Sequence, residues 1–195
     1  MTSWQRSTRR PWQILPWILL LLLLPLLPAQ QADVDERPRA KDRQISIIVT
    51  TLLQRQHLNK QKLNDEISKR TLELMLQRLD PRRLYLLKED VESFRTQEMK
   101  IDDMLRQTDL SFLYEIYNQF AARVTGRLPM IDRWIDAEHD YSVEESYTVT
   151  GKTTAYAADD QEMDSRWRLR IKYDLLVLQS SGASLEQSRE RLRRR

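Results

Sequence analysis

The segment from Leu110 to Ile135 most constrains the fold, because its apolar side chains recur at spacings of three and four residues. This periodicity places one broad apolar stripe along a long helix. The stripe consists of Leu110, Leu113, Tyr114, Tyr117, Ala121, Val124, Leu128, Ile131 and Ile135. Gly126 and Pro129 interrupt it, so we expect a kink or break near them. A helix with so wide an apolar face must bury that face against other elements, which predicts a helical domain.

Shorter amphipathic segments lie on both sides of this helix. The same spacing predicts helices over residues 44–57, 67–79, 88–105, 167–178 and from Ser184 onward. Gly182 stands where a helix C-terminal cap is expected, and Ser184 with Gln187 forms a capping box. The fold class is therefore mainly α, with five to six amphipathic helices.

Two connections between these helices are distinctive. Asp80-Pro81 predicts a break and restart, because Asp can cap a helix start and Pro fits the first turn. Residues 136–164 have a more polar and β-branched composition. Tyr147–Thr150 and Thr153–Tyr156 flank Gly151-Lys152, which indicates a short β-hairpin or, alternatively, an extended loop over the helices. The path of residues 137–164 stays open at this stage.

The N-terminus has the order of a secretory signal peptide. Arg6, Arg9 and Arg10 precede an apolar run over residues 12–27, and small and then acidic residues follow. We expect residues 1–32 to be a signal peptide, 33–43 a charged linker and 44–195 the helical domain. The alternative is an uncleaved anchor, which would contact the membrane only through residues 12–27. Either way the protein is expected to be exported to the periplasm or cell envelope, associated with the inner membrane if the anchor is kept.

Composition excludes several function classes. The sequence has 32 Lys and Arg against 29 Asp and Glu, and residues 1–32 account for the excess. The exported part is thus formally neutral, so we expect no nucleic-acid partner. Three glycines in 195 residues leave no phosphate-binding loop, and adjacent Glu138, His139 and Asp140 do not converge on an ion. We assign no catalytic, cofactor-binding or metal-binding residue.

Four stretches of the sequence resemble a known family. They are Leu79–Phe94, Leu110–Tyr117, Trp167–Leu176 and Leu178–Leu192. In this order and spacing they are similar to the N-terminal helical domain of the tail-specific, or carboxyl-terminal processing, proteases. The resemblance covers about Thr51 to Arg194. It departs at Ala155-Tyr156-Ala157-Ala158, where the family often has a Trp-Pro pair.

The resemblance implies a helical scaffold region of an exported serine endopeptidase that degrades or processes proteins from their C-terminal ends. In that family a PDZ module and a serine–lysine catalytic domain follow the helical domain, and neither is present in these residues. The expected partners are therefore an intramolecular protease core and, through the missing domains, protein substrates with apolar C-termini. We expect the chain alone to be inactive, and the short last helix to reflect a truncation. The alternative is a stand-alone envelope protein-interaction module with no enzymatic role.

Overall fold

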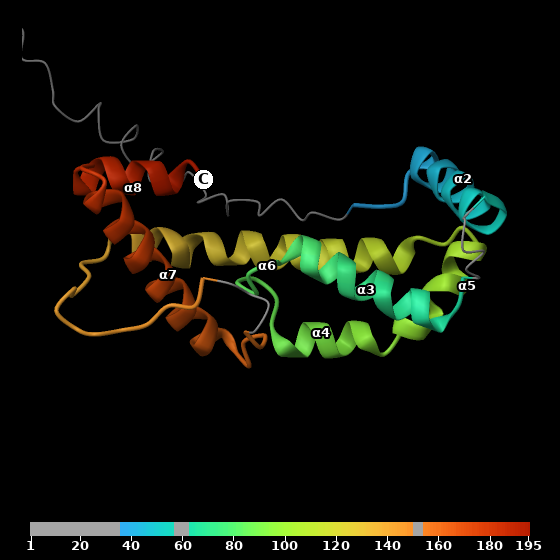
Figure 1. Ribbon diagram of the computed structural model, residues 1–195, viewed down its shortest axis with the longest axis horizontal. Helices are drawn as coiled ribbons and strands as arrows, with labels where there is room; N and C mark the ends of the chain where they lie inside the picture. Colours follow the sequence, from blue (N-terminus) through green and yellow to red (C-terminus); the bar gives the residue numbers. More distant parts are fainter. Residues whose placement is uncertain (1–35, 57–62, 150–153) are drawn as a thin grey trace, which may run out of the picture. The chain divides into compact units, whose positions relative to one another are not determined.

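A computed structural model describes residues 36–56, 63–149 and 154–195, which belong to the unit Val34–Arg195. The expected signal peptide and the glycine turn at Gly151 lie outside the described residues. The helices are α2 (Ala40–Gln56), α3 (Asp65–Leu79), α4 (Lys88–Arg95), the short 3₁₀ helix η2 (Glu98–Lys100), α5 (Ile101–Arg106), α6 (Ser111–Asp136), α7 (Asp160–Ser180) and α8 (Leu185–Arg193) (Figure 1). Within the described ranges there is no strand, only one parallel bridge between Leu87 and Ala157. The mainly α fold class is confirmed.

Local chemistry accounts for several helix ends. The Asn64 side chain accepts from the Ile67 amide at the start of α3, and Asp159 accepts from Glu162 at the start of α7. Ser184 and Gln187 form the reciprocal capping box predicted for α8. Gly182 ends α7 with a φ of 92°, a conformation that side-chain-bearing residues rarely adopt. These two predicted caps are confirmed.

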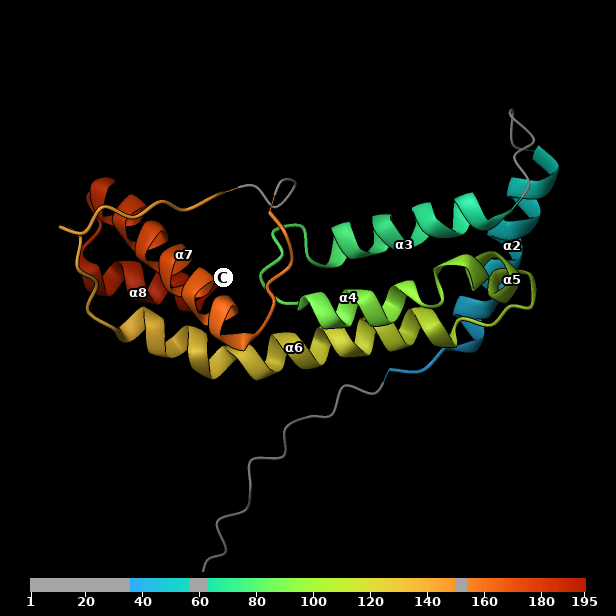
Figure 2. The same ribbon diagram turned by 90° about the horizontal axis from the view of Figure 1, so that it is seen from below.

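Helix α6 is the element on which the rest of the domain packs. Figure 2 shows α3 and α4 along its first half and α7 and α8 beside its second half. One buried cluster joins the first half to α3, α4 and α5, and a second joins the other half to α7 and α8. The first contains Leu72, Leu76, Leu86, Val91, Phe94, Ile101, Phe112 and Ile116; the second contains Ile135, Ile171 and Leu175, with Trp167 and Leu192 against it. The predicted apolar stripe is thus buried only in part.

The single helix predicted over residues 88–105 is wrong. The chain breaks after Arg95, continues through η2 and forms α5 as a separate short helix. The break brings Ile101 and Asp102 into the interior beside α3. There the Ser68 hydroxyl donates to Asp102 Oδ1 and accepts from the Asp102 amide, each at 2.8 Å. Tertiary packing therefore divides the chain into two helices where the spacing of apolar residues predicts one.

Of the kink or break predicted in the long helix, the break is absent. α6 runs through Gly126 and Pro129 to Asp136 without interruption. Contacts on both sides hold the backbone helical: Arg127 bonds the preceding loop, and Ile135 is buried against α7. These contacts offset the one backbone hydrogen bond that a proline removes.

Helix α2 begins at Ala40, four residues before the expected start.

The described residues of the 137–159 segment run as an extended loop without a ladder of strand hydrogen bonds. Glu145 fixes this loop to α7 through Arg168 and Lys172, and these two hydrogen bonds lower the pKa of Glu145 to about 2. Among the described helices, none combines the length and apolar character needed to cross a bilayer.

Candidate functional site

Helix α6 presents two opposite faces, and each lines a concave surface. At 100° per residue, Gln119, Met130 and Arg133 share one face. Leu128 and Ile135 lie on the other. The first face is polar and meets the start of α7. The second is apolar and meets the body of α7 and α8.

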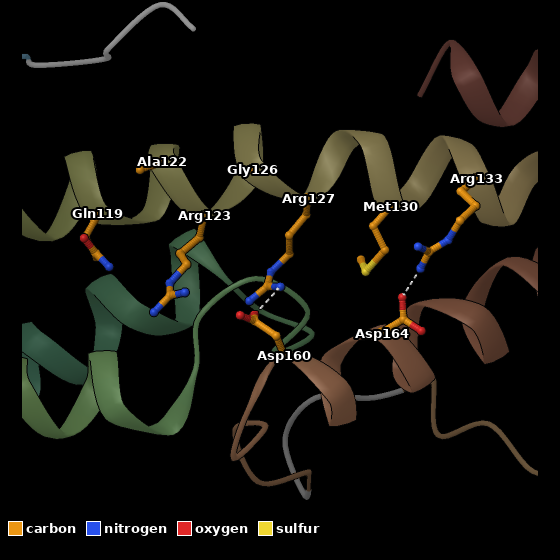
Figure 3. A pocket seen from close by; sticks show the side chains of 9 residues that line it. All are labelled: Gln119, Ala122, Arg123, Gly126, Arg127, Met130, Arg133, Asp160 and Asp164. Atoms are coloured by element: carbon orange, nitrogen blue, oxygen red, sulfur yellow. Dashed lines mark hydrogen bonds and ion pairs between the residues drawn. The ribbon is translucent and has the colours of Figure 1, made fainter.

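The polar face lines a cavity of about 650 Å³, shown in Figure 3. Helix α6 contributes three arginines to it, and the first turns of α7 contribute two acids opposite them. The lining residues are Gln119, Ala122, Arg123, Gly126, Arg127, Met130, Arg133, Asp160 and Asp164. Each arginine has an acidic partner: Arg127 bonds Asp160 and Arg133 bonds Asp164, as the dashed lines in Figure 3 mark.

Arg123 and Asp90 form a bidentate pair. Arg123 Nε and Nη2 donate to the two carboxylate oxygens of Asp90 at 3.0 and 2.8 Å, and Arg123 Nη2 also reaches Glu89. Asp90 further accepts from Gln119 and from the Leu87 amide, which caps α4. Burial alone would raise the pKa of Asp90, but these donors outweigh it and the pKa is lowered. The pair ties α4 to α6.

Arg127 is the buried member of the group. Its Nε donates to the Tyr85 carbonyl and its Nη1 to Asp160, both at 3.0 Å. The Arg127 side chain is 7% exposed, whereas that of Asp160 is 72% exposed. Arg127 Nη2 is buried with no partner among the described residues. The guanidinium therefore joins α6 to the loop before α4 and to the start of α7.

That loop, residues 80–87, is organised by Asp80. The buried carboxylate accepts from the amides of Leu84, Tyr85 and Leu86 at 2.8, 3.0 and 3.0 Å. Asp80 is thus the residue after α3 and caps the loop, which corrects the prediction that it caps a helix start. Since α4 begins only at Lys88, it is Asp90 that caps that helix from within.

The same loop is bonded to α7 and to the segment before it. The Trp167 indole donates to the Leu84 carbonyl at 2.7 Å, and the Lys88 amide donates to the Ala157 carbonyl at 2.8 Å. Arg83, with a φ of 54°, directs its guanidinium to the Thr154 carbonyl. The departure Ala155–Ala158 therefore lies beside the Asp-Pro loop, with Ala157 fully buried against it.

The opposite, apolar face of α6 lines a groove of about 410 Å³, which we call the α6–α8 groove. Its apolar lining is Leu84, Tyr85, Val124, Leu128, Ile131, Ile135, Trp167, Ile171 and Leu192. Leu128, one of these lining residues, is 51% exposed. The charged residues at the groove are largely paired within the domain: Arg170 with Asp174 at 2.7 Å, and Arg193 with Asp136.

The hydrogen bonds and ion pairs around the polar cavity and the α6–α8 groove hold helices together. At neither surface do the described residues bring a nucleophile and a base into contact. His139 Nε2 contacts the Trp134 carbonyl oxygen at 2.9 Å, while His57 lies outside the described residues. In the parts of the chain that the structure describes, no three His, Cys, Asp or Glu side chains gather as a metal site. The C-terminal arginines have structural contacts: Arg189 donates to the carbonyls of Ile135 and Asp136, which end α6.

Sequence reasoning missed Asp90, Arg123 and Arg127. A signal was present, since Arg123 and Arg127 lie four residues apart on the polar side of a strongly apolar helix. Their partners lie about thirty to forty residues away in sequence, so periodicity could not identify them.

Comparison with known proteins shows which family this chain resembles. The family model described as "Tail specific protease N-terminal domain" matches residues 48–195. A relative from Haemophilus influenzae, named "Tail-specific protease", is 24% identical over 147 residues, which cover 75% of this chain and 21% of that protein. The chain therefore spans about a fifth of that relative. The resemblance stated from the four sequence stretches is confirmed.

Proposed function

Because the chain belongs to the family of tail-specific protease N-terminal domains, we propose that it is a non-catalytic helical scaffold of an exported serine endopeptidase. Such an enzyme would degrade or process proteins from their C-terminal ends. The cleavage chemistry would come from a serine–lysine catalytic domain, and substrate selection from a PDZ module that binds apolar C-termini. Export would follow from the signal-peptide order of residues 1–32 and would place the domain in the periplasm or cell envelope.

The α6–α8 groove is the observation that carries the scaffold role. Its floor is packed as a core, with Ile135 and Ile171 almost inaccessible, yet Leu128 is half exposed and its apolar neighbours in the groove are only partly buried. Burying apolar surface contributes roughly 25 cal/mol per Å². A contiguous apolar groove rimmed by charged side chains is typical of a surface that another protein body covers. We assign that body to the protease core.

The polar contacts fit the same role. The Asp80 carboxylate orders the loop before α4, Arg127 joins that loop to α6, and the Arg123–Asp90 pair joins α4 to α6. These groups are engaged within the domain and would remain engaged after docking. The groove is then presented on a rigid support, which limits the conformational entropy lost on association.

A binding measurement with two matched variants tests the proposal. The full chain is titrated against the separately produced PDZ and serine–lysine portion of a tail-specific protease from the same genome. Leu128→Asp should weaken this association about 100-fold, equivalent to about 2.7 kcal/mol, because a charge replaces a buried apolar contact. Leu74→Asp, at a position of α3 that is 48% exposed, should bind like the parent.

Two results would count against this proposal. No association with the core, together with cooperative unfolding of the chain alone, would favour a stand-alone interaction module. Equal weakening by both substitutions would show that the groove is not the contact surface.

A further inference from the structure

Helix α6 forms one wall of the α6–α8 groove with four apolar side chains on a single side. They follow one another at intervals of four, three and four residues and are Val124, Leu128, Ile131 and Ile135. At 100° per residue they lie within about 60° of one another, and from first to last they extend roughly 17 Å along the axis. Tyr85 lies at one end of this stripe, between Phe120 and Arg127, and α8 lies at the other, where Arg189 bonds the Ile135 carbonyl. The wall is therefore long enough to contact about three turns of another helix.

The apolar lining offers an occupant no main-chain hydrogen bond. Its α6, α7 and α8 residues belong to helices, which bond their backbone groups internally. Its loop residues are Leu84 and Tyr85, whose amides donate to Asp80. The Leu84 carbonyl accepts from Trp167, and the Tyr85 carbonyl accepts from Arg127. Both the donors and the acceptors of these two loop residues are thus engaged within the domain.

This lack of main-chain partners decides which backbone conformation fits the groove. An extended segment would leave its own amides and carbonyls unpaired against apolar side chains, which is unfavourable. A helix bonds its backbone groups within itself and presents an apolar stripe to its surroundings. Amphipathic helices fill protein grooves in this way, through side chains at intervals of three and four residues. The groove therefore fits a helix rather than a strand.

The charges at the groove indicate the polar character of the occupant. Arg170 and Arg193 have acidic partners within the domain. At the α8 end, Asp132 and Arg195 are both exposed and opposite in sign. At the end near Tyr85, the exposed Arg82 forms no ion pair with any residue that the structure describes. An acidic side chain on the occupant would complement Arg82.

We propose that the segment of the protease core that fills the α6–α8 groove is an amphipathic helix of about three turns, with an acidic side chain opposite Arg82. Apolar side chains of that helix cover Leu128. This assignment rests on the proposed function, because it takes the protease core as the partner. It adds the conformation and the charge of the segment that makes the contact.

Cross-linking in the complex tests the conformation of the segment. Because the chain has no cysteine, Leu128→Cys can carry a single benzophenone label. Irradiation in the presence of the PDZ and serine–lysine portion, followed by mass spectrometry, identifies the contacted segment. The control is Ile48→Cys on α2, where Ile45, Ile48 and Leu52 are each about half exposed but do not line the groove. Cysteines are then placed one at a time along the identified segment, and disulfide formation with Leu128→Cys is measured.

Disulfide yields should peak at intervals of three and four residues, as expected for one side of a helix. Peaks at every second residue would indicate a strand and overturn the proposal. A yield without any period, or equal labelling of the same segment from position 48, would also overturn it.

Charge reversal tests the acidic partner. Arg82→Glu should weaken association with the core about ten-fold, because repulsion replaces attraction. Arg70→Glu, at an exposed α3 position outside the groove, should bind like the parent. Replacing an acid of the identified segment with lysine should restore binding to Arg82→Glu. Equal effects of the two arginine variants, or no restoration by any acid of the segment, would overturn the assignment.

These outcomes are distinct from failure of the scaffold role. If Leu128→Asp leaves the association unchanged, the proposed function falls and this inference falls with it. If Leu128→Asp weakens the association but the helical period or the charge effect is absent, only this inference is overturned.

Discussion

Replacement of Asp80 by Asn gives the sharpest test of how the domain is held together. Asp80 is 1% exposed, and its two carboxylate oxygens accept from three consecutive loop amides. Asn has nearly the same shape, so packing is preserved and the change is confined to hydrogen bonding. One Asn oxygen can still serve the Leu84 amide. The Asn amide group would then face the Tyr85 and Leu86 amides, donor against donor.

The magnitude follows from the number of donors left without an acceptor. A hydrogen bond to a charged group contributes about 1.5–3 kcal/mol, and an unsatisfied buried donor costs about 1–3 kcal/mol. Two donors are affected and their effects are not independent, so we expect Asp80→Asn to lower the free energy of unfolding by about 3 kcal/mol.

Urea unfolding of the full chain, followed by far-ultraviolet circular dichroism, measures this change. The matched control is Glu73→Gln, an exposed acid on α3, which should stay within about 0.5 kcal/mol of the parent. The midpoint should fall without a change in the denaturant slope, since the fold is retained. If Asp80→Asn matched the control, the loop would not depend on its carboxylate and the reasoning would be refuted.

Three further predictions use the same measurement. Arg127→Met should cost about 2–3 kcal/mol while Asp160→Asn costs less than about 1 kcal/mol, because only the arginine is buried; equal costs would contradict this. Ser68→Ala should cost about 1–3 kcal/mol, since it removes both hydrogen bonds to Asp102, and a neutral result would show that water replaces the hydroxyl. The pKa of Asp90 is lowered in the folded state, so its contribution is present above its ordinary value near 3.8 and is lost as the pH falls through the folded pKa. Asp90→Asn should therefore be less stable than the parent at neutral pH, with the difference shrinking in acid; a difference independent of pH would contradict the assignment.

The helices and their caps could be predicted because they depend on nearby residues. Ser184 with Gln187 and Gly182 act within one or two turns, and the structure places each as expected. The extent of the third predicted helix could not be obtained in this way. Ser68 holds Asp102 from 34 positions away, and that contact decides where the chain turns.

The direction in which an apolar stripe faces also cannot be predicted from periodicity. Spacing indicates that Ile45, Ile48 and Leu52 share one side of a helix, but not whether that side faces the core or the outside. Here the polar contacts of Asp42 with Tyr114 decide the question. The pairing of Arg127 with Tyr85 is hidden for the same reason, because its two ends belong to segments with separate local patterns.

The scaffold role itself depends on the α6–α8 groove being covered by a protease core. In this cysteine-free chain, the reaction rate of a Leu128→Cys thiol with a water-soluble maleimide reports directly on that surface. We predict that the rate falls to a plateau as the PDZ and serine–lysine portion is added, while the rate at Leu74→Cys stays constant. An unchanged rate at Leu128→Cys, with the core bound to the chain, would contradict the account.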